Sequence, residues 1–146
     1  MLSGVAADLE KQIGVLVEDL APGLVAAEPG VGALSAAQVL LSFSHAGRIH
    51  SEAAFAMLSG TAPVPVSSGR IDRHRLNRLG DRQLNRALQV IAVSRMRGHT
   101  ATRAYVQRRR AEGKTDRKIR RCIKRYLARH LYRALTSQLD QRPQTG

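Results

Sequence analysis

The sequence predicts an all-α protein, and three observations lead to this expectation. Apolar residues recur at spacings of three and four, as they do on one face of a helix. Glycine and proline mark the ends of these periodic stretches, and Asp81, Thr100 and Thr115 stand where helix-capping residues are expected. Finally, 146 residues with 43% hydrophobic content suit one small domain that carries a helical arm.

The first helix is expected within an arm at residues 1–27, ended by Pro22-Gly23. Its apolar face consists of Val5, Leu9, Ile13, Leu16, Val17 and Leu20. Such a stripe needs a partner surface, since a lone helix is marginal in water. Two partners remain open at this point, a second copy of the arm or the rest of the same chain.

Residues 28–45 are expected to form a helix-hairpin-helix, with the second helix beginning near Ser35. The turn reads Pro29-Gly30-Val31-Gly32. At Gly30 and Gly32 the absent β-carbons would let backbone N–H groups approach a phosphate closely. A plain turn between two helices would have the same sequence, so the motif alone does not decide between them.

Beyond this turn, a short helix from Ser51 to Leu58 and an irregular loop over 60–69 are expected. Three helices then follow, capped by Asp81, Thr100 and Thr115. Gly98 and Gly113 end the first two. The domain is expected to span 28–135, followed by a polar tail at 136–146.

The charge is strongly divided along the chain. The formal net charge is +13, yet residues 1–66 hold two basic and six acidic side chains, whereas residues 67–146 hold 22 and five. The second part therefore predicts contact with a polyanion, with double-stranded DNA as the first candidate. Aromatic content is only 3%, which favours backbone contact over base stacking and assigns Tyr126 to the core.

Other classes of protein are disfavoured. Cys122 is the single cysteine, and the five histidines show no metal-ligand spacing, so no disulfide, zinc site or other metal site is expected in this chain. No apolar run reaches the roughly 18 residues of a membrane span, and no signal peptide is recognisable. We therefore expect a cytoplasmic protein with no membrane partner.

Four short motifs, in order and spacing, resemble the C-terminal domain of the bridge-RNA-guided insertion-sequence transposases. They are Pro29-Gly30-Val31-Gly32 with Ala36-Ala37, then Gly60 and Pro63, then Ser68-Gly69, then Asn77-Arg78-Leu79-Gly80-Asp81 leading into Leu84 and Leu88. That family pairs an RNase H-like N-terminal domain with a C-terminal domain that bears a nucleophilic serine. The resemblance implies transposition of DNA, with a structured guide RNA as a further partner.

The resemblance also implies roles for individual residues. Ser68 matches the serine that attacks a DNA phosphate, and Ser67 remains the alternative nucleophile. Independently of the resemblance, Arg70, Arg73 and Arg75 lie close enough in sequence to stabilise the charge of the pentacovalent phosphorus. DNA contacts are expected from these three, from Arg78, and from Arg121 and Arg125 on the last helix. His74 is a weaker candidate as a proton shuttle.

The family's metal-binding carboxylates lie in the N-terminal domain, which we expect this chain to lack. Mg²⁺ is therefore expected there, with no cofactor held by this chain. The alternative function is a non-catalytic DNA-binding or dimerising fragment, which acts with an intact transposase subunit or inhibits it. A structural RNA-binding protein and a tyrosine recombinase fit less well, because Ser68-Gly69 argues against the first and no activating Arg and His set surrounds the tyrosines.

Overall fold

A computed structural model describes residues 2–44, residue 55 and residues 78–140. Within these ranges the regular structure is entirely helical, which confirms the all-α prediction. The helices are α1 (Leu2–Leu20), α2 (Leu24–Ala27), α3 (Ala33–Ser44), α6 (Arg78–Gly98), α7 (Thr100–Ala111) and α8 (Asp116–Asp140). None of these helices is both long and apolar enough to cross a membrane.

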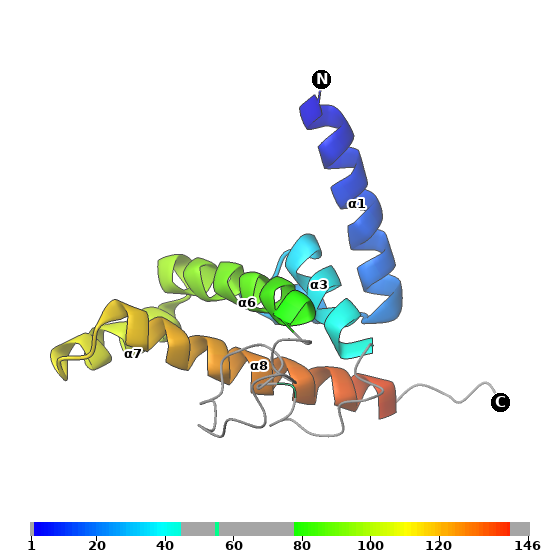
Figure 1. Ribbon diagram of the computed structural model, residues 1–146. Coiled ribbons are helices and arrows are strands. Elements are labelled where there is room, and N and C mark those ends of the chain that lie inside the picture. The colour runs from blue at the N-terminus through cyan, green and yellow to red at the C-terminus, as the bar shows by residue number, and fades with distance from the viewer. Residues whose placement is uncertain (1, 45–54, 56–77, 141–146) are drawn as a thin grey trace.

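The helices pack as a layered bundle from which α1 projects (Figure 1). Helix α1 contacts α3, α3 lies on α6, and α6 lies on α8. Helix α7 folds back along the first part of α8, so these two helices form a hairpin at the opposite side of the molecule from α1. The bundle therefore places the projecting end of α1 and the turn between α7 and α8 at different ends of the molecule.

The core lies where α3, α6 and α8 meet. Its fully buried side chains include Leu84, Leu88 and Ile91 of α6 with Leu127 and Leu131 of α8. An aromatic cluster closes one end, because the ring centroids of Phe43, Phe55 and Tyr132 lie 5.5 to 6.3 Å apart. Edge and tilted contacts of this kind add to the energy of burial.

The apolar residues of α1 divide between two faces. Val17 is buried and Ile13 packs against the core, and Gly14 lies beside Ala33 of α3, where a Cβ at position 14 would be in ordinary contact at 3.7 Å. By contrast, the side chains of Val5, Leu9 and Leu16 are 54–60% exposed. The rest of the chain thus covers only part of the apolar stripe of α1. A second copy of the arm, the other expected partner, could cover the remainder.

The ends of the C-terminal helices were predicted with mixed success. The Oγ1 of Thr115 accepts a hydrogen bond from the Lys118 N–H at 3.3 Å, which confirms Thr115 as the cap of α8. The predictions for Asp81 and Thr100 were wrong, because Asp81 lies inside α6 and His99 is the residue that precedes α7. Helix α8 continues to Asp140.

Candidate nucleic-acid interface

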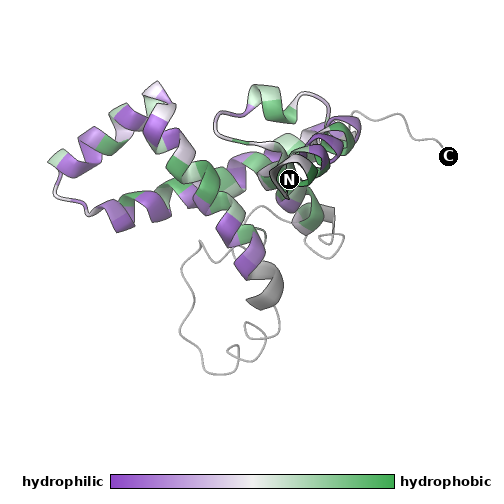
Figure 2. Ribbon diagram, turned by 90° about the horizontal axis from the view of Figure 1, so that it is seen from above, coloured by the Kyte–Doolittle hydropathy of each residue, from purple (hydrophilic) through white to green (hydrophobic). Residues whose placement is uncertain are grey.

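The candidate interface is the hairpin of α7 and α8, residues 100–140, which we call the basic hairpin. Its turn forms because Gly113 adopts a positive φ of 86° and its N–H donates to Arg110 O at 2.9 Å. Hydrophilic residues cover much of both helices (Figure 2). Exposed cationic residues on the hairpin are Arg103, Arg108, Arg110, Lys114, Arg117, Lys118, Arg121 and Arg133.

Two ion pairs stiffen the tip of the basic hairpin. Arg110 binds Asp116 in a bidentate contact of 2.7 and 3.0 Å, and Arg109 binds Glu112 at 2.8 Å. The Arg110 guanidinium lowers the pKa of Asp116, while Tyr105 and Glu112 raise the pKa of Arg109. Both arginines therefore remain cationic at every physiological pH, and the few acidic groups leave most of the positive charge in excess.

Lys124 on α8 is partly buried and lies near two other cations. Partial burial, together with the charges of Arg120 and Arg121, lowers the pKa of its ammonium group. Like charges at this spacing repel one another. A bound polyanion would reduce this repulsion.

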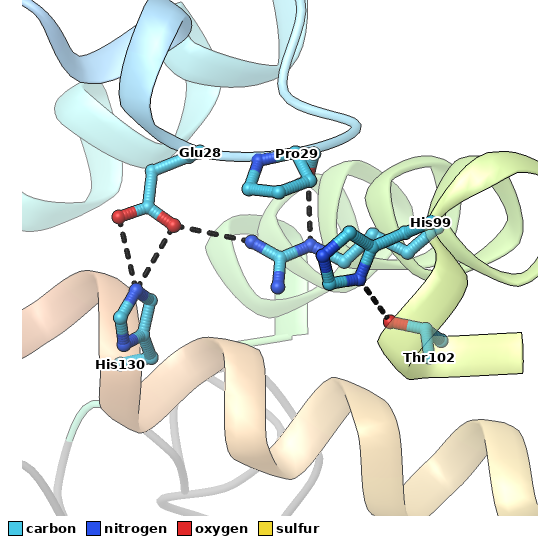
Figure 3. A network of polar contacts seen from close by, with 6 residues as sticks. Glu28, Pro29, His99, Thr102 and His130 are labelled. Carbon is cyan, nitrogen blue, oxygen red and sulfur yellow. Dashed lines mark hydrogen bonds and ion pairs between the residues drawn. The ribbon is translucent and has the colours of Figure 1, made fainter. Parts of the chain in front are cut away.

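A buried polar network fixes the turn that precedes α3 to the C-terminal helices (Figure 3). Arg95, only 6% exposed, donates from Nε to Pro29 O at 2.7 Å and from Nη2 to Glu28 Oε2 at 3.1 Å. His130 Nε2 donates to both Glu28 oxygens at 2.9 Å. One carboxylate thus joins the turn to both α6 and α8.

Sequence reasoning missed this network, in which Glu28 was counted only as one of the acidic residues and His130 as ungrouped. A signal was present on α6. Leu88, Ile91 and Arg95 follow one another at helical spacing, so a charged residue continues an apolar stripe. A buried charge needs a partner of opposite sign, and Glu28 supplies it.

The two glycines predicted to approach phosphate have different surroundings. Gly30 has a positive φ of 78°, and a Cβ there would lie 3.0 Å from Ile91 O and 3.1 Å from Arg95 Cγ. Gly32 has no atom within 4 Å of its would-be Cβ. Close packing against α6 is therefore sufficient reason for glycine at position 30, whereas the open space at Gly32 leaves phosphate approach there as a prediction.

The other predicted site residues are only partly covered by the structure. Arg121 and Arg125 lie on the basic hairpin, as expected, and Arg78 is the first residue of α6. The loop residues lie outside the described residues, namely Ser67, Ser68, Arg70, Arg73, His74 and Arg75. The roles assigned to them remain predictions.

The assignment of Tyr126 to the core was wrong. Its side chain is 54% exposed and its ring stacks on His130, with centroids 5.5 Å apart and an interplanar angle of 13°. On α8 the buried positions are Ile123 and Leu127, and Tyr126 lies beside this stripe. The exposed ring of Tyr126 therefore lies among the cations of the basic hairpin.

Comparison with known proteins identifies the family of this chain. Residues 24–107 match the sequence pattern of the transposase IS116/IS110/IS902 family. The chain is also 39% identical over 110 residues to the "Insertion element IS110 uncharacterized 43.6 kDa protein" of Streptomyces coelicolor (strain ATCC BAA-471 / A3(2) / M145). That match covers 73% of this chain and 27% of the relative, and no solved structure matches significantly. The chain belongs to the IS116/IS110/IS902 family of transposases.

Proposed function

We propose that this chain is the DNA-handling, serine-bearing part of an insertion-sequence transposase, and that the basic hairpin is its main contact with duplex DNA. The observation that carries the proposal is the concentration of exposed cations on α7 and α8 in a member of a transposase family. Such contacts are made to phosphates, so they position the duplex without reading its bases. Binding is thus expected to be tight and weakly dependent on sequence.

Salt dependence tests the binding part of the proposal. The affinity for a duplex should fall with salt at a log–log slope of about −0.9 per phosphate contacted. The double variant Arg121→Ala, Arg125→Ala should make that slope shallower by up to about two contacts. Lys11→Ala is the matched control, because it removes a charge from α1, away from the basic hairpin. A flat salt response, or an equal change in the control, would contradict the assignment.

The catalytic part of the proposal assigns the nucleophile to Ser68. The serine Oγ would attack phosphorus, the bond to the leaving sugar oxygen would break, and the serine proton would pass to a base while the sugar oxygen gains a proton. A phosphoserine link then keeps the energy of the phosphodiester for rejoining. Arg70, Arg73 and Arg75 follow the serine closely enough in sequence to offset the added negative charge.

Metal chemistry is left to the rest of the transposase. Among the residues that the structure describes, no three His, Cys, Asp or Glu side chains gather as ligands. No step is therefore assigned to a metal held by these helices. We assign Mg²⁺ to a carboxylate-bearing N-terminal domain of the whole transposase. The matched segment makes up 27% of the Streptomyces relative, so a protein of that length has room for such a domain.

Covalent capture of DNA tests the nucleophile. In a full-length transposase that contains this region, Ser68→Ala should abolish the protein–DNA adduct seen by denaturing electrophoresis with labelled insertion-sequence ends. Affinity for DNA should stay within about tenfold, since one neutral hydroxyl contributes about 1 kcal/mol. Ser67→Ala is the matched control and should retain the adduct. An adduct that persists in Ser68→Ala and disappears in Ser67→Ala would move the nucleophile by one residue.

The second candidate function is a dimerising, non-catalytic fragment that pairs with an intact subunit. The exposed apolar residues of α1, including Leu9 and Leu16, favour it. Mixing the 146-residue chain with a full-length transposase distinguishes the two functions. A fall in adduct yield with added chain would support a fragment that acts on intact subunits, whereas unchanged yield would argue against it.

A further inference from the structure

An open pocket lies against the basic hairpin, and neither backbone contact nor serine chemistry uses it. The pocket has a volume of about 350 Å³ and lies where the end of α6 meets α7 and α8. Its walls include Arg95, His99, Thr102, Tyr105, Cys122 and Tyr126. Small-molecule sites in proteins begin at about 300 Å³, so the pocket has room for one flat heterocycle.

The chemistry of the walls suits a nucleobase. Tyr105 and Tyr126 supply aromatic surface from the two facing helices, and Tyr126 remains 54% exposed although one ring, that of His130, stacks on it. His99 Nδ1 lies 2.7 Å from Thr102 Oγ1, a contact that orients the imidazole beside the pocket (Figure 3). The tyrosine hydroxyls and the imidazole provide donors and acceptors that base edges need, while the Arg95 guanidinium is already held by Pro29 and Glu28.

The surroundings indicate that the heterocycle is attached to a phosphate chain. A second pocket of about 210 Å³ shares Cys122 with the first and is lined by Arg109, Lys114, Lys118 and Arg121. The Arg108 and Arg109 guanidinium carbons also lie 5.5 and 5.8 Å from the Tyr105 ring centroid. An aromatic pocket beside a cationic groove is complementary to an unstacked base and the phosphates next to it.

We infer that this pocket, here called the base pocket, takes a single unpaired base of the bound DNA while the neighbouring cations hold its backbone. The inference rests on the proposed DNA binding and adds a preference for DNA that contains an unpaired nucleotide. Strand exchange requires that bases leave their original pairs. A site for one such base would favour the opened form of the duplex over the closed one.

Three DNA duplexes of the same sequence test the inference with the intact chain. One is fully paired, one carries a single bulged base, and the third carries an abasic residue at the bulge, which keeps the bend without the base. The chain should bind the duplex with the bulged base about tenfold more tightly than the duplex with the abasic bulge. This is the difference in affinity expected when one base stacks on one aromatic ring. Fluorescence anisotropy at fixed salt gives the three affinities.

Variants assign the preference to the base pocket. Tyr126→Ala should reduce the tenfold preference to about twofold or less, whereas Tyr126→Phe should retain it. Lys118→Ala should lower the affinity for all three duplexes by similar factors, because it removes a phosphate contact. Since Tyr126 is half exposed, thermal melting followed by circular dichroism should show that each variant remains folded.

Three results would overturn the inference. The first is equal affinity for the bulged base and the abasic bulge, with paired DNA still bound, which would leave the proposed function intact. The second is a preference that Tyr126→Ala leaves unchanged. The third is tenfold tighter binding of the same bulge in an RNA duplex, which would assign the pocket to RNA. If no duplex binds at all, the proposed function fails together with the inference.

Discussion

Helices α1 and α8 begin and end the described part of the chain. Both have apolar residues at helical spacing, but these residues are buried to different degrees. On α8 the residues Ile119, Ile123, Leu127, Leu131 and Leu135 are all buried in the bundle. Among the α1 residues whose burial the structure describes, Val17 alone is buried to a similar degree, and several other apolar residues are more than half exposed. Apolar spacing thus predicts that a helix forms, but it does not say which surface will cover the helix.

The two charged regions differ in a related way. The acidic part of the chain contributes one carboxylate, Glu28, to the interior, where it meets Arg95 and His130 of the basic part. The acidic and basic residues at the tip of the basic hairpin meet at the surface instead. Removing one partner of the first contact would leave a buried charge uncompensated and is costly, whereas breaking a surface pair costs little.

The largest effect is expected from Glu28→Ala. Without the carboxylate, Arg95 stays buried without its ionic partner, and His130 loses its contact. Removing one member of a buried pair costs about 3–5 kcal/mol of the free energy of unfolding. Urea denaturation measures this loss, and a cost below about 1 kcal/mol would show that the network adds little.

Glu112→Ala is the matched control for Glu28→Ala. It removes a carboxylate from an ion pair with Arg109 that remains partly exposed to solvent. The free energy of unfolding should stay nearly unchanged. If both variants lost similar stability, the contrast between the buried and the surface contacts would be wrong.

A smaller loss of stability is expected from Gly30→Ala. This variant is compared with Gly32→Ala in the same turn. A Cβ at Gly30 would approach Ile91 O to 3.0 Å, and its positive φ is unfavourable for alanine. The cost should be about 1–3 kcal/mol. Gly32→Ala should change stability by less than about 1 kcal/mol, since open space surrounds it. Only Gly32 variants can therefore test phosphate approach in an unperturbed fold.

Much of the fold could be predicted from the sequence, because helix periodicity and glycine stops are local signals. The site could be predicted less well. Glu28 and His130 are 102 positions apart in the chain, so no local sequence pattern predicts their contact. Tyr126 has a helical spacing that fits the apolar stripe, yet it lies at the edge of the buried face. Pairing and exposure depend on how helices dock, and a single sequence does not encode that directly.

The smallest change in stability is expected at the exposed face of α1, which completes the comparison with α8. In the double variant Leu9→Gln, Leu16→Gln both side chains are more than half exposed in the single chain, so the free energy of unfolding of the monomer should change by about 0.5 kcal/mol or less. Ile13 is left unchanged because it packs against the core.

The same double variant should nevertheless lower the oligomeric state. If a second copy covers the exposed face of α1, light scattering should give about twice the chain mass of 16.0 kDa for the native protein and a single-chain mass for the variant. Val17→Ala is the control on the opposite face: it should reduce stability, because Val17 is buried, while folded protein keeps its mass. A native protein that remains a monomer at high concentration would show that α1 does not self-associate, and its exposed leucines would then require a different partner.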